Sequence, residues 1–199
     1  MKHGYIIRIN GTPDWSQIPI IAINTQAKPR KAAIAAFAQI CYDDSALYLH
    51  LYAEETDVRA EVTDSMGQTC EDSCLEFFFR PDPTDLRYFN IEFNLNCCPF
   101  IGFGSGFENL IRLYPLTDRF SPCAKKNANG WEITYSVPFS FICQFFPMFS
   151  PVPGKTIRAN FYKCGDKTAI PHYYCWEMPA KRPHGFHSPE CFGELTFLA

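Results

Sequence analysis

The clearest pattern along the chain is the alternation of apolar and polar side chains in residues 74–80 and again in residues 88–96. It predicts two β-strands, because successive side chains of a strand point to opposite faces. Residues 80–85 (RPDPTD) are rich in turn-forming residues, so we expect the strands to pair as an antiparallel hairpin. The apolar face that would pack on the core contains Leu75, Phe77, Phe79, Phe89, Ile91, Phe93 and Leu95.

The other face of the predicted hairpin is polar and is a candidate binding surface. Pairing would place Glu76 beside a row that contains Asn90 and Glu92, with Arg80 at the end of its strand. Carboxylates, amides and a guanidinium on a rigid sheet suit a neutral polyhydroxyl ligand, which offers paired donors and acceptors. A solvated sheet face without a ligand would show the same pattern, so periodicity alone leaves both interpretations open.

Further alternating segments predict a chain built mostly of strands. Residues 155–163 alternate with Arg158 and Asn160 on a polar face, and residues 131–137 place Trp131 on an apolar face. Short strands at regular intervals with little helix are typical of an antiparallel β-sandwich. We predict an all-β, jelly-roll-like antiparallel sandwich with at most one or two short helices, forming a single domain over residues 1–199.

Three segments are less clear. Residues 32–42 are rich in alanine, but the Asp43-Asp44-Ser45 turn and the alternation of residues 46–52 favour a strand in a hairpin. Residues 138–146 begin with proline, which favours a short helix. The glycines of residues 101–106 lack phosphate-loop spacing, so we interpret this stretch as a flexible connection or bulge.

Composition narrows the class of partner. Aromatic residues make up 16% of the chain and charged residues only 20%, which indicates a folded protein. The net charge is -3 and no Lys/Arg run alternates with aromatics, which argues against nucleic acid. No apolar stretch is long enough to span a membrane, and no secretory signal is visible. We expect a cytoplasmic protein, or a secreted one if a signal has been removed.

The chain contains 10 cysteines, but their spacing does not indicate a metal centre. No CxxC occurs; the nearest arrangements are Cys70-x-x-x-Cys74 and the adjacent Cys97 and Cys98, neither of which is usual for zinc. A chain of 199 residues can build a core without disulfides. We therefore interpret most of the cysteines as small buried hydrophobic residues.

Six short motifs occur in a fixed order over nearly the whole chain. They lie in residues 14–19, 42–48, 70–78, 88–94, 131–139 and 186–195, and include EDSCLEFF at residues 71–78 and SPECFGEL at residues 188–195. Their order and spacing resemble carbohydrate-binding module family 9, in particular its stand-alone family 9-like branch. The resemblance implies a β-sandwich and a non-catalytic module that recognises a mono- or oligosaccharide, in connection with polysaccharide catabolism.

The resemblance also implies where the sugar would bind. In well-understood members two tryptophans sandwich a sugar ring while neighbouring strands supply polar contacts. Cys70 and Phe186 stand where these tryptophans would be expected, Glu76 keeps the family's carboxylate, and Glu92 stands where an amide is expected. Pattern and resemblance together give these candidate ligand contacts: Glu76, Arg80, Asn90, Glu92, Arg158, Asn160, Trp176, Phe186 and His187.

The cofactor and partner expectations follow from the same resemblance. No catalytic residue and no obligatory cofactor is predicted. Some members bind calcium, which keeps calcium as a candidate; the acidic residues Asp43, Asp44, Glu71 and Asp72 could contribute oxygens. The expected partner is a carbohydrate, and docking to a glycoside hydrolase is left open.

Other function classes stay open at the level of the sequence. Glu76 and Glu92 on adjacent strands could serve glycoside hydrolysis. Met178, His172 or His187 could ligate haem, although such residues are more often core or surface. A Cys/His nucleophile is a weak hypothesis because 10 cysteines and 5 histidines make chance pairings common. A sandwich that has lost its sugar site could serve as a protein-interaction domain.

Overall fold

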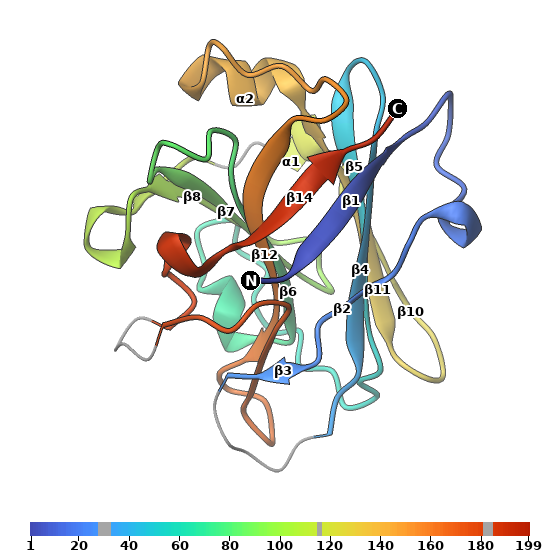
Figure 1. Ribbon diagram of the computed structural model, residues 1–199. Helices are drawn as coiled ribbons and strands as arrows, with labels where there is room; N and C mark the ends of the chain where they lie inside the picture. Colours follow the sequence, from blue (N-terminus) through green and yellow to red (C-terminus); the bar gives the residue numbers. More distant parts are fainter. Residues whose placement is uncertain (28–32, 115–116, 181–184) are drawn as a thin grey trace.

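The computed structural model describes residues 1–27, 33–114, 117–180 and 185–199, and this part of the chain is mostly β-strand (Figure 1). The strands are β1 (His3–Arg8), β2 (Ile21–Ala22), β3 (Thr25–Gln26), β4 (Ala36–Tyr42), β5 (Ala46–Ala53), β6 (Cys74–Arg80), β7 (Tyr88–Asn94), β8 (Pro99–Gly104), β9 (Ile111–Arg112), β10 (Cys123–Lys126), β11 (Trp131–Pro138), β12 (Thr156–Gly165), β13 (His172–Cys175) and β14 (Gly193–Phe197).

Helical structure is limited to short segments. The α-helices of the described residues are α1 (Thr117–Phe120) and α2 (Phe139–Phe145), and α2 confirms the helix predicted after Pro138. Single turns of 3-10 helix are η1 (Trp15–Gln17), η2 (Thr69–Glu71), η3 (Phe107–Asn109) and η4 (Pro189–Cys191). Within the described part of the chain, no helix combines the length and apolar character that a membrane span requires.

The strands form two sheets that share β1. The first runs β1-β14-β12-β6-β7-β8-β9, and the second runs β1-β4-β5-β11-β10 (Figure 1). Residues His3 to Ile6 of β1 pair with β14, while Ile7 and Arg8 pair with β4, so one strand passes from sheet to sheet. The predicted all-β sandwich is confirmed. Both pairings of β1 are parallel, which makes the sheet arrangement mixed where the sequence pattern suggested antiparallel pairing throughout.

Both predicted hairpins form. β6 pairs antiparallel with β7, and Glu76 lies directly opposite Glu92. β4 pairs with β5, so the alanine-rich segment from Ala36 onward is a strand despite its helix propensity. Residue 32, where the predicted strand began, lies outside the described residues. β12 lies on the other side of β6, which places three strands with polar positions side by side.

Residues 101–106 differ from the expectation, because their first part belongs to a regular strand. β8 pairs with β7 from Tyr88 opposite Gly104 to Phe93 opposite Pro99. A Cβ atom on Gly104 would lie 2.4 Å from the carbonyl oxygen of Asn109, and one on Gly102 would lie 3.0 Å from Leu110. The glycines therefore allow the following segment to pack closely on the strand, a use that sequence pattern cannot separate from flexibility.

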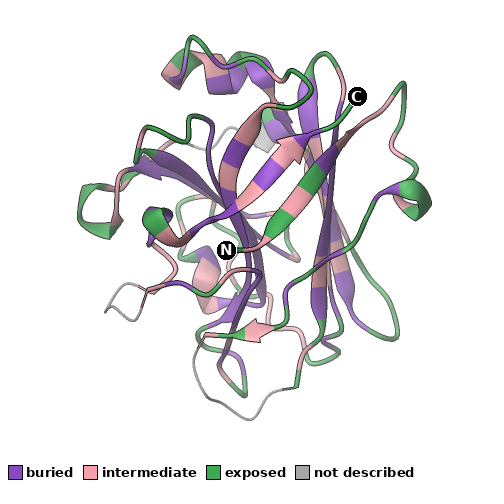
Figure 2. Ribbon diagram, viewed as in Figure 1, coloured by how far each residue is buried: buried purple, intermediate pink, exposed green. Residues whose placement is uncertain are grey.

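The apolar faces of the two sheets enclose one large aromatic core. Phe77 is fully buried and stacks on Phe79 and Phe161, with ring centroids 4.8 and 4.9 Å apart. Figure 2 shows β6 and β12 buried over most of their length. The predicted core positions on β6 and β7 are confirmed, and Leu95 packs against the same core while only partly buried.

A buried polar network crosses this core. Lys163 of β12 is fully buried, and its Nζ lies 3.0 Å from Oε2 of Glu55, which follows β5. The same Glu55 accepts hydrogen bonds from Nε1 of Trp131 on β11 at 3.0 Å and from Oγ of Ser73 at 2.9 Å. Lys163 also donates to Nε2 of His172 at 2.8 Å. The network connects the two sheets through one ion pair.

We expect Glu55→Gln to lower the free energy of unfolding by about 3 kcal/mol, because it leaves the Lys163 ammonium buried without its counter-charge. Chemical denaturation would measure the change. The control is Glu54→Gln at the exposed neighbouring position, for which we expect less than about 0.5 kcal/mol. Equal effects of the two substitutions would show that the ion pair does not stabilise the fold.

Candidate functional site

The polar face of β6, β7 and β12 is buried, which excludes the interpretation as a solvated sheet face. Glu76 is 2% exposed, Glu92 is 6% exposed and Asn90 is fully buried. Part of this face is covered by the segment before β14. A second, smaller apolar cluster forms there from Phe78, Tyr88, Tyr162, Cys175 and Phe192, with Phe186, Leu110 and Ala27 packed at its edge.

Two carboxylates and an amide lie together at the centre of this face. Glu76 and Glu92 are opposite each other in the β6–β7 register, and Nδ2 of Asn90 donates to Oε1 of Glu92 at 3.0 Å. Oδ1 of Asn90 is buried and has no hydrogen-bond partner among the described residues. The hairpin register therefore brings together three of the predicted contacts and leaves one acceptor, Oδ1 of Asn90, without a partner among the described residues.

Neither of the two carboxyls, Glu76 and Glu92, is paired with a basic side chain of the described residues. Within the described residues no Lys or Arg forms an ion pair with either one, because the nearby cations are occupied elsewhere. Lys163 points to the other face of the sheet, where it pairs with Glu55. The guanidinium of Arg112 donates to the backbone carbonyls of Ser65, Met66, Gly67 and Pro99.

Burial raises the pKa of both carboxyls. Burial, followed by the charge of Glu92, raises the pKa of Glu76 well above its ordinary value. Burial also raises the pKa of Glu92, against the opposing effect of the hydrogen bond from Asn90. In a low-dielectric environment, a ligand that donates hydrogen bonds to these oxygens would stabilise their charged form.

Aromatic side chains flank this polar centre. Tyr162 lies opposite Glu76 in the β12–β6 register. The ring of Phe186 stacks on the ring of Tyr162, with centroids 4.0 Å apart and an interplanar angle of 20°. Asn160 donates to the Tyr162 hydroxyl at 2.8 Å, and that hydroxyl donates to the Phe186 carbonyl at 3.0 Å. Asn160 therefore acts on Phe186 through Tyr162, so the two predicted contacts belong to one chain of interactions.

His187 lies on the same face, next to Tyr88 and Phe78. Its Nδ1 is 2.7 Å from the hydroxyl of Tyr88, and its ring lies 5.3 Å from those of Phe78 and Phe107. Phe107 is half exposed, so this part of the aromatic cluster reaches the surface. The structure thus places the predicted pair Phe186 and His187 beside the carboxylate-bearing strands.

The two predicted arginines lie opposite each other in the β6–β12 register, at the end of the face where β7 begins with Tyr88. Arg80 donates to the carbonyls of Pro83, Asp85 and Pro189, and Arg158 donates to the carbonyl of Phe192. These bonds connect the sheet to the hairpin loop and to the segment before β14. Both guanidinium groups therefore help to hold the covering segment, whether or not they also contact a ligand.

Trp176 is not brought together with the other candidates. It is 5% exposed and packs in the main core, with its ring centroid 6.0 Å from that of Phe161 on the far side of the sheet from Glu76. The absence of a side chain at Gly193 makes this possible, since a Cβ there would lie 2.6 Å from the Trp176 ring. Four consecutive apolar residues at 173–176 do not reveal which face each one takes.

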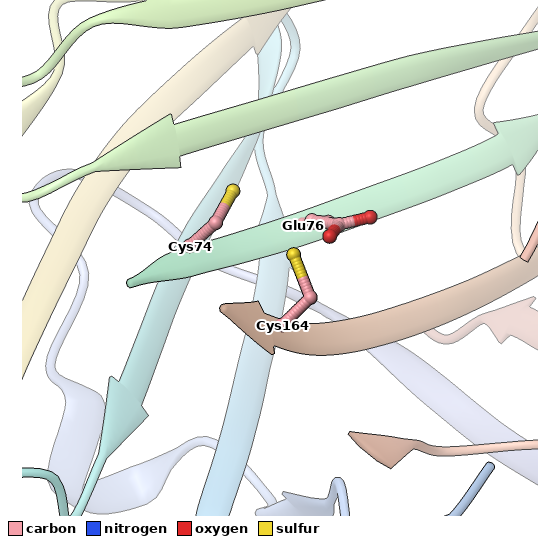
Figure 3. Close-up of side chains that lie close together, drawn as sticks. All are labelled: Cys74, Glu76 and Cys164. Carbon is pink, nitrogen blue, oxygen red and sulfur yellow. The ribbon is translucent and has the colours of Figure 1, made fainter. Parts of the chain in front are cut away.

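Sequence reasoning did not select the cysteines around Glu76 as site residues. Cys74 and Glu76 lie on β6 and Cys164 lies on β12, and Figure 3 shows the Cys164 thiol directed toward β6. Cys70 in η2 is half-buried, and its thiol pKa is raised by burial and by the charges of Glu92 and Glu76 nearby. The alternation of β6 could have identified Cys74 as a site residue, because Cys74 and Glu76 are two residues apart and their side chains share a face.

A separate surface pocket of about 310 Å³ lies between the β6–β7 loop and the end of α2. It is lined by Asp85, Arg87 and Phe146 among others, but the Arg87 guanidinium is paired with Asp85 at 2.6 Å and lies over the Phe146 ring. The buried face around Glu76 is the better candidate site, since it holds two buried carboxylates and the Oδ1 of Asn90, which has no partner among the described residues.

Comparison with known proteins identifies the family of this chain. The sequence model described as carbohydrate-binding family 9 matches residues 14–197. This chain belongs to carbohydrate-binding family 9. The resemblance inferred from its motifs is confirmed, and no curated protein matches the chain.

Solved structures share the family 9 fold. A candidate carbohydrate-binding protein from Bacteroides uniformis superposes with a TM-score of 0.84 at 25% identity, over 98% of this chain and 99% of that one. A family 9 module from Caldicellulosiruptor kristjanssonii in complex with cellotriose has a TM-score of 0.73 at 12% identity, over 100% and 94%. The same module in complex with glucose gives 0.71 at 12% identity, over 98% and 95%.

We expect Glu92→Gln to raise the free energy of unfolding by about 1 to 2 kcal/mol at about pH 8 in metal-free buffer, because it removes one of two adjacent buried carboxylates while keeping Oε1 for Asn90. Thermal or chemical denaturation would measure it. The exposed Glu54→Gln is the matched control. A loss of stability in Glu92→Gln would show that the carboxylate pair is not a source of strain.

Proposed function

We propose that this family 9 chain binds a neutral mono- or oligosaccharide, with Glu76, Asn90 and Glu92 as its polar contacts. One observation carries the proposal: two carboxylates and the Oδ1 of Asn90, which has no hydrogen-bond partner among the described residues, lie together on a rigid, nearly buried sheet face beside the stacked rings of Phe186 and Tyr162. Glucose and cellotriose are bound by the Caldicellulosiruptor module of the same fold, which makes them the first ligands to test.

The chemistry of a sugar ring matches this arrangement. Its hydroxyls donate hydrogen bonds, and bonds to a carboxylate are stronger than those between neutral groups. Its axial C–H groups form an apolar face that packs on an aromatic ring. Phe186 and His187 would supply that apolar contact, and Asn160 would position Phe186 through Tyr162. Arg80 and Trp176 are left out of the proposed contacts because their polar or apolar groups already serve the fold. Arg158 holds the Phe192 carbonyl through Nη2, while its buried Nε has no partner among the described residues.

Binding is favoured over glycoside hydrolysis by the environment of the two carboxyls. A hydrolase of the usual kind keeps one carboxyl protonated and the other ionised, which requires two different surroundings. Here Glu76 and Glu92 are opposite each other on one buried face, and burial raises the pKa of both. Incubation with cellotriose followed by a reducing-sugar assay would detect hydrolysis directly.

We expect glucose or cellotriose to bind wild type, and Glu76→Gln and Glu92→Gln each to weaken binding by about 10- to 100-fold, which corresponds to losing a charge-assisted hydrogen bond. Isothermal titration calorimetry would measure the affinities. The control is Glu132→Gln on the second sheet, where the carboxylate bonds His50 and lies away from the proposed site.

The result that would overturn the proposal is equal sugar affinity in all four proteins, or no binding by wild type at millimolar sugar. Because Glu92→Gln is expected to fold more stably than wild type, a loss of binding in that variant would not be explained by unfolding.

A second variant tests the aromatic contact. Phe186→Leu keeps an apolar side chain against Tyr162 but removes the flat ring, so we expect sugar affinity to fall by about threefold to tenfold. Met178→Leu at an exposed position is the control. Unchanged affinity in Phe186→Leu would assign the apolar contact to another residue while leaving the polar contacts to be judged separately.

A further inference from the structure

Two thiols and a carboxylate converge beside the sheet centre. Cys74 lies directly opposite Cys164 in the β6–β12 register, and Glu76 follows two residues after Cys74, so all three share one face (Figure 3). Their Sγ and carboxylate oxygen atoms all lie within 4.8 Å of one another, and all three residues are buried. This arrangement comes from two strands far apart in sequence.

A fourth donor lies next to them. Oε2 of Glu92 is 4.0 Å from Sγ of Cys74, and Glu92 is opposite Glu76. Zinc bound tetrahedrally at about 2.3 Å to sulfur and about 2.0 Å to oxygen holds its ligand atoms on the order of 3.5 to 4 Å apart. The donor atoms of Cys74, Glu76 and Cys164 are therefore close to the required spacing, and a side-chain rotation of Glu92 would add the fourth.

The charges around these donors favour a cation. Glu76 and Glu92 are nearly buried and adjacent, and the described residues place no Lys or Arg in an ion pair with them. The thiols make long contacts with backbone carbonyls, at 3.9 Å from Leu75 for Cys74 and 3.8 Å from Cys70 for Cys164, and they also interact with each other and with the two carboxylates. A divalent ion could bind both carboxylates and, with the two thiol protons released to solvent, both sulfurs as thiolates.

We propose that Cys74, Cys164, Glu76 and Glu92 form a binding site for a thiophilic divalent metal ion such as Zn²⁺. Thiolate ligands select zinc over calcium, which requires six or more oxygens. The site goes beyond saccharide binding and does not depend on it. Because Glu76 and Glu92 belong to both proposed sites, metal and sugar would compete.

The test uses the full chain, reduced and then freed of metal with a chelator. Zn²⁺ is titrated in competition with a chromophoric chelator, and Co²⁺ is titrated separately to detect cobalt–thiolate charge-transfer absorbance. We expect about one equivalent to bind with a thiolate spectrum. We expect Cys74→Ser, Cys164→Ser and Glu76→Gln each to weaken binding by about tenfold or more.

Two controls address the other cysteines of the chain. Cys41→Ser alters a buried thiol on the second sheet, and Cys97→Ser alters a half-buried thiol outside the cluster; both should bind as wild type does. Circular dichroism without metal checks folding, and Glu76→Gln serves as the variant of unchanged shape if a serine variant fails to fold.

Three results would overturn the proposal. They are wild-type affinity in both Cys164→Ser and Glu76→Gln, a cobalt complex without thiolate absorbance, and isolation of a Cys74–Cys164 disulfide that reductant does not open. Metal binding by a protein that binds no sugar would leave this site intact and remove only the saccharide proposal.

Discussion

Burial of the central strands on both faces is the constraint on which the rest of this structure depends. β6 and β7 are buried along their full length, with an aromatic core on one side and loops and the segment before β14 on the other. A polar side chain on the second face therefore needs a partner within the protein or a ligand. Asn160 has such partners, whereas the buried Oδ1 of Asn90 has none among the described residues.

The covering segment is held by hydrogen bonds to its backbone. Arg80 and Arg158 donate to carbonyls of Pro189 and Phe192, and the Tyr162 hydroxyl donates to the carbonyl of Phe186. These contacts leave the side chain of Phe186 to be positioned by stacking on Tyr162. Arg80 and Arg158, which the sequence suggested as ligand contacts, thus hold the backbone of the segment that covers the site.

This chain carries Cys70 and Phe186 at the two positions where tryptophan is expected in family 9 members. Phe186 keeps an aromatic ring beside the polar centre, so a stacking contact is retained in a smaller form. Cys70 does not; its half-buried thiol lies near Cys74, and its backbone carbonyl is 3.8 Å from the Cys164 thiol. The same sheet face therefore combines features suited to a sugar with features suited to a metal ion.

The sequence by itself determined most of the strands and the β6–β7 hairpin, and it placed Glu76 beside the row that contains Asn90 and Glu92, because alternation and turn residues are local signals. The register that sets Glu76 opposite Glu92 came from the structure. The family motifs also identified the fold. Only the tertiary structure decided that the polar face is covered, that Trp176 faces the main core, that Arg80 and Arg158 bind backbone carbonyls, and that Cys164 meets Cys74. Each of these depends on contacts between residues distant in sequence, and a period of two says which face a side chain takes but not what lies above that face.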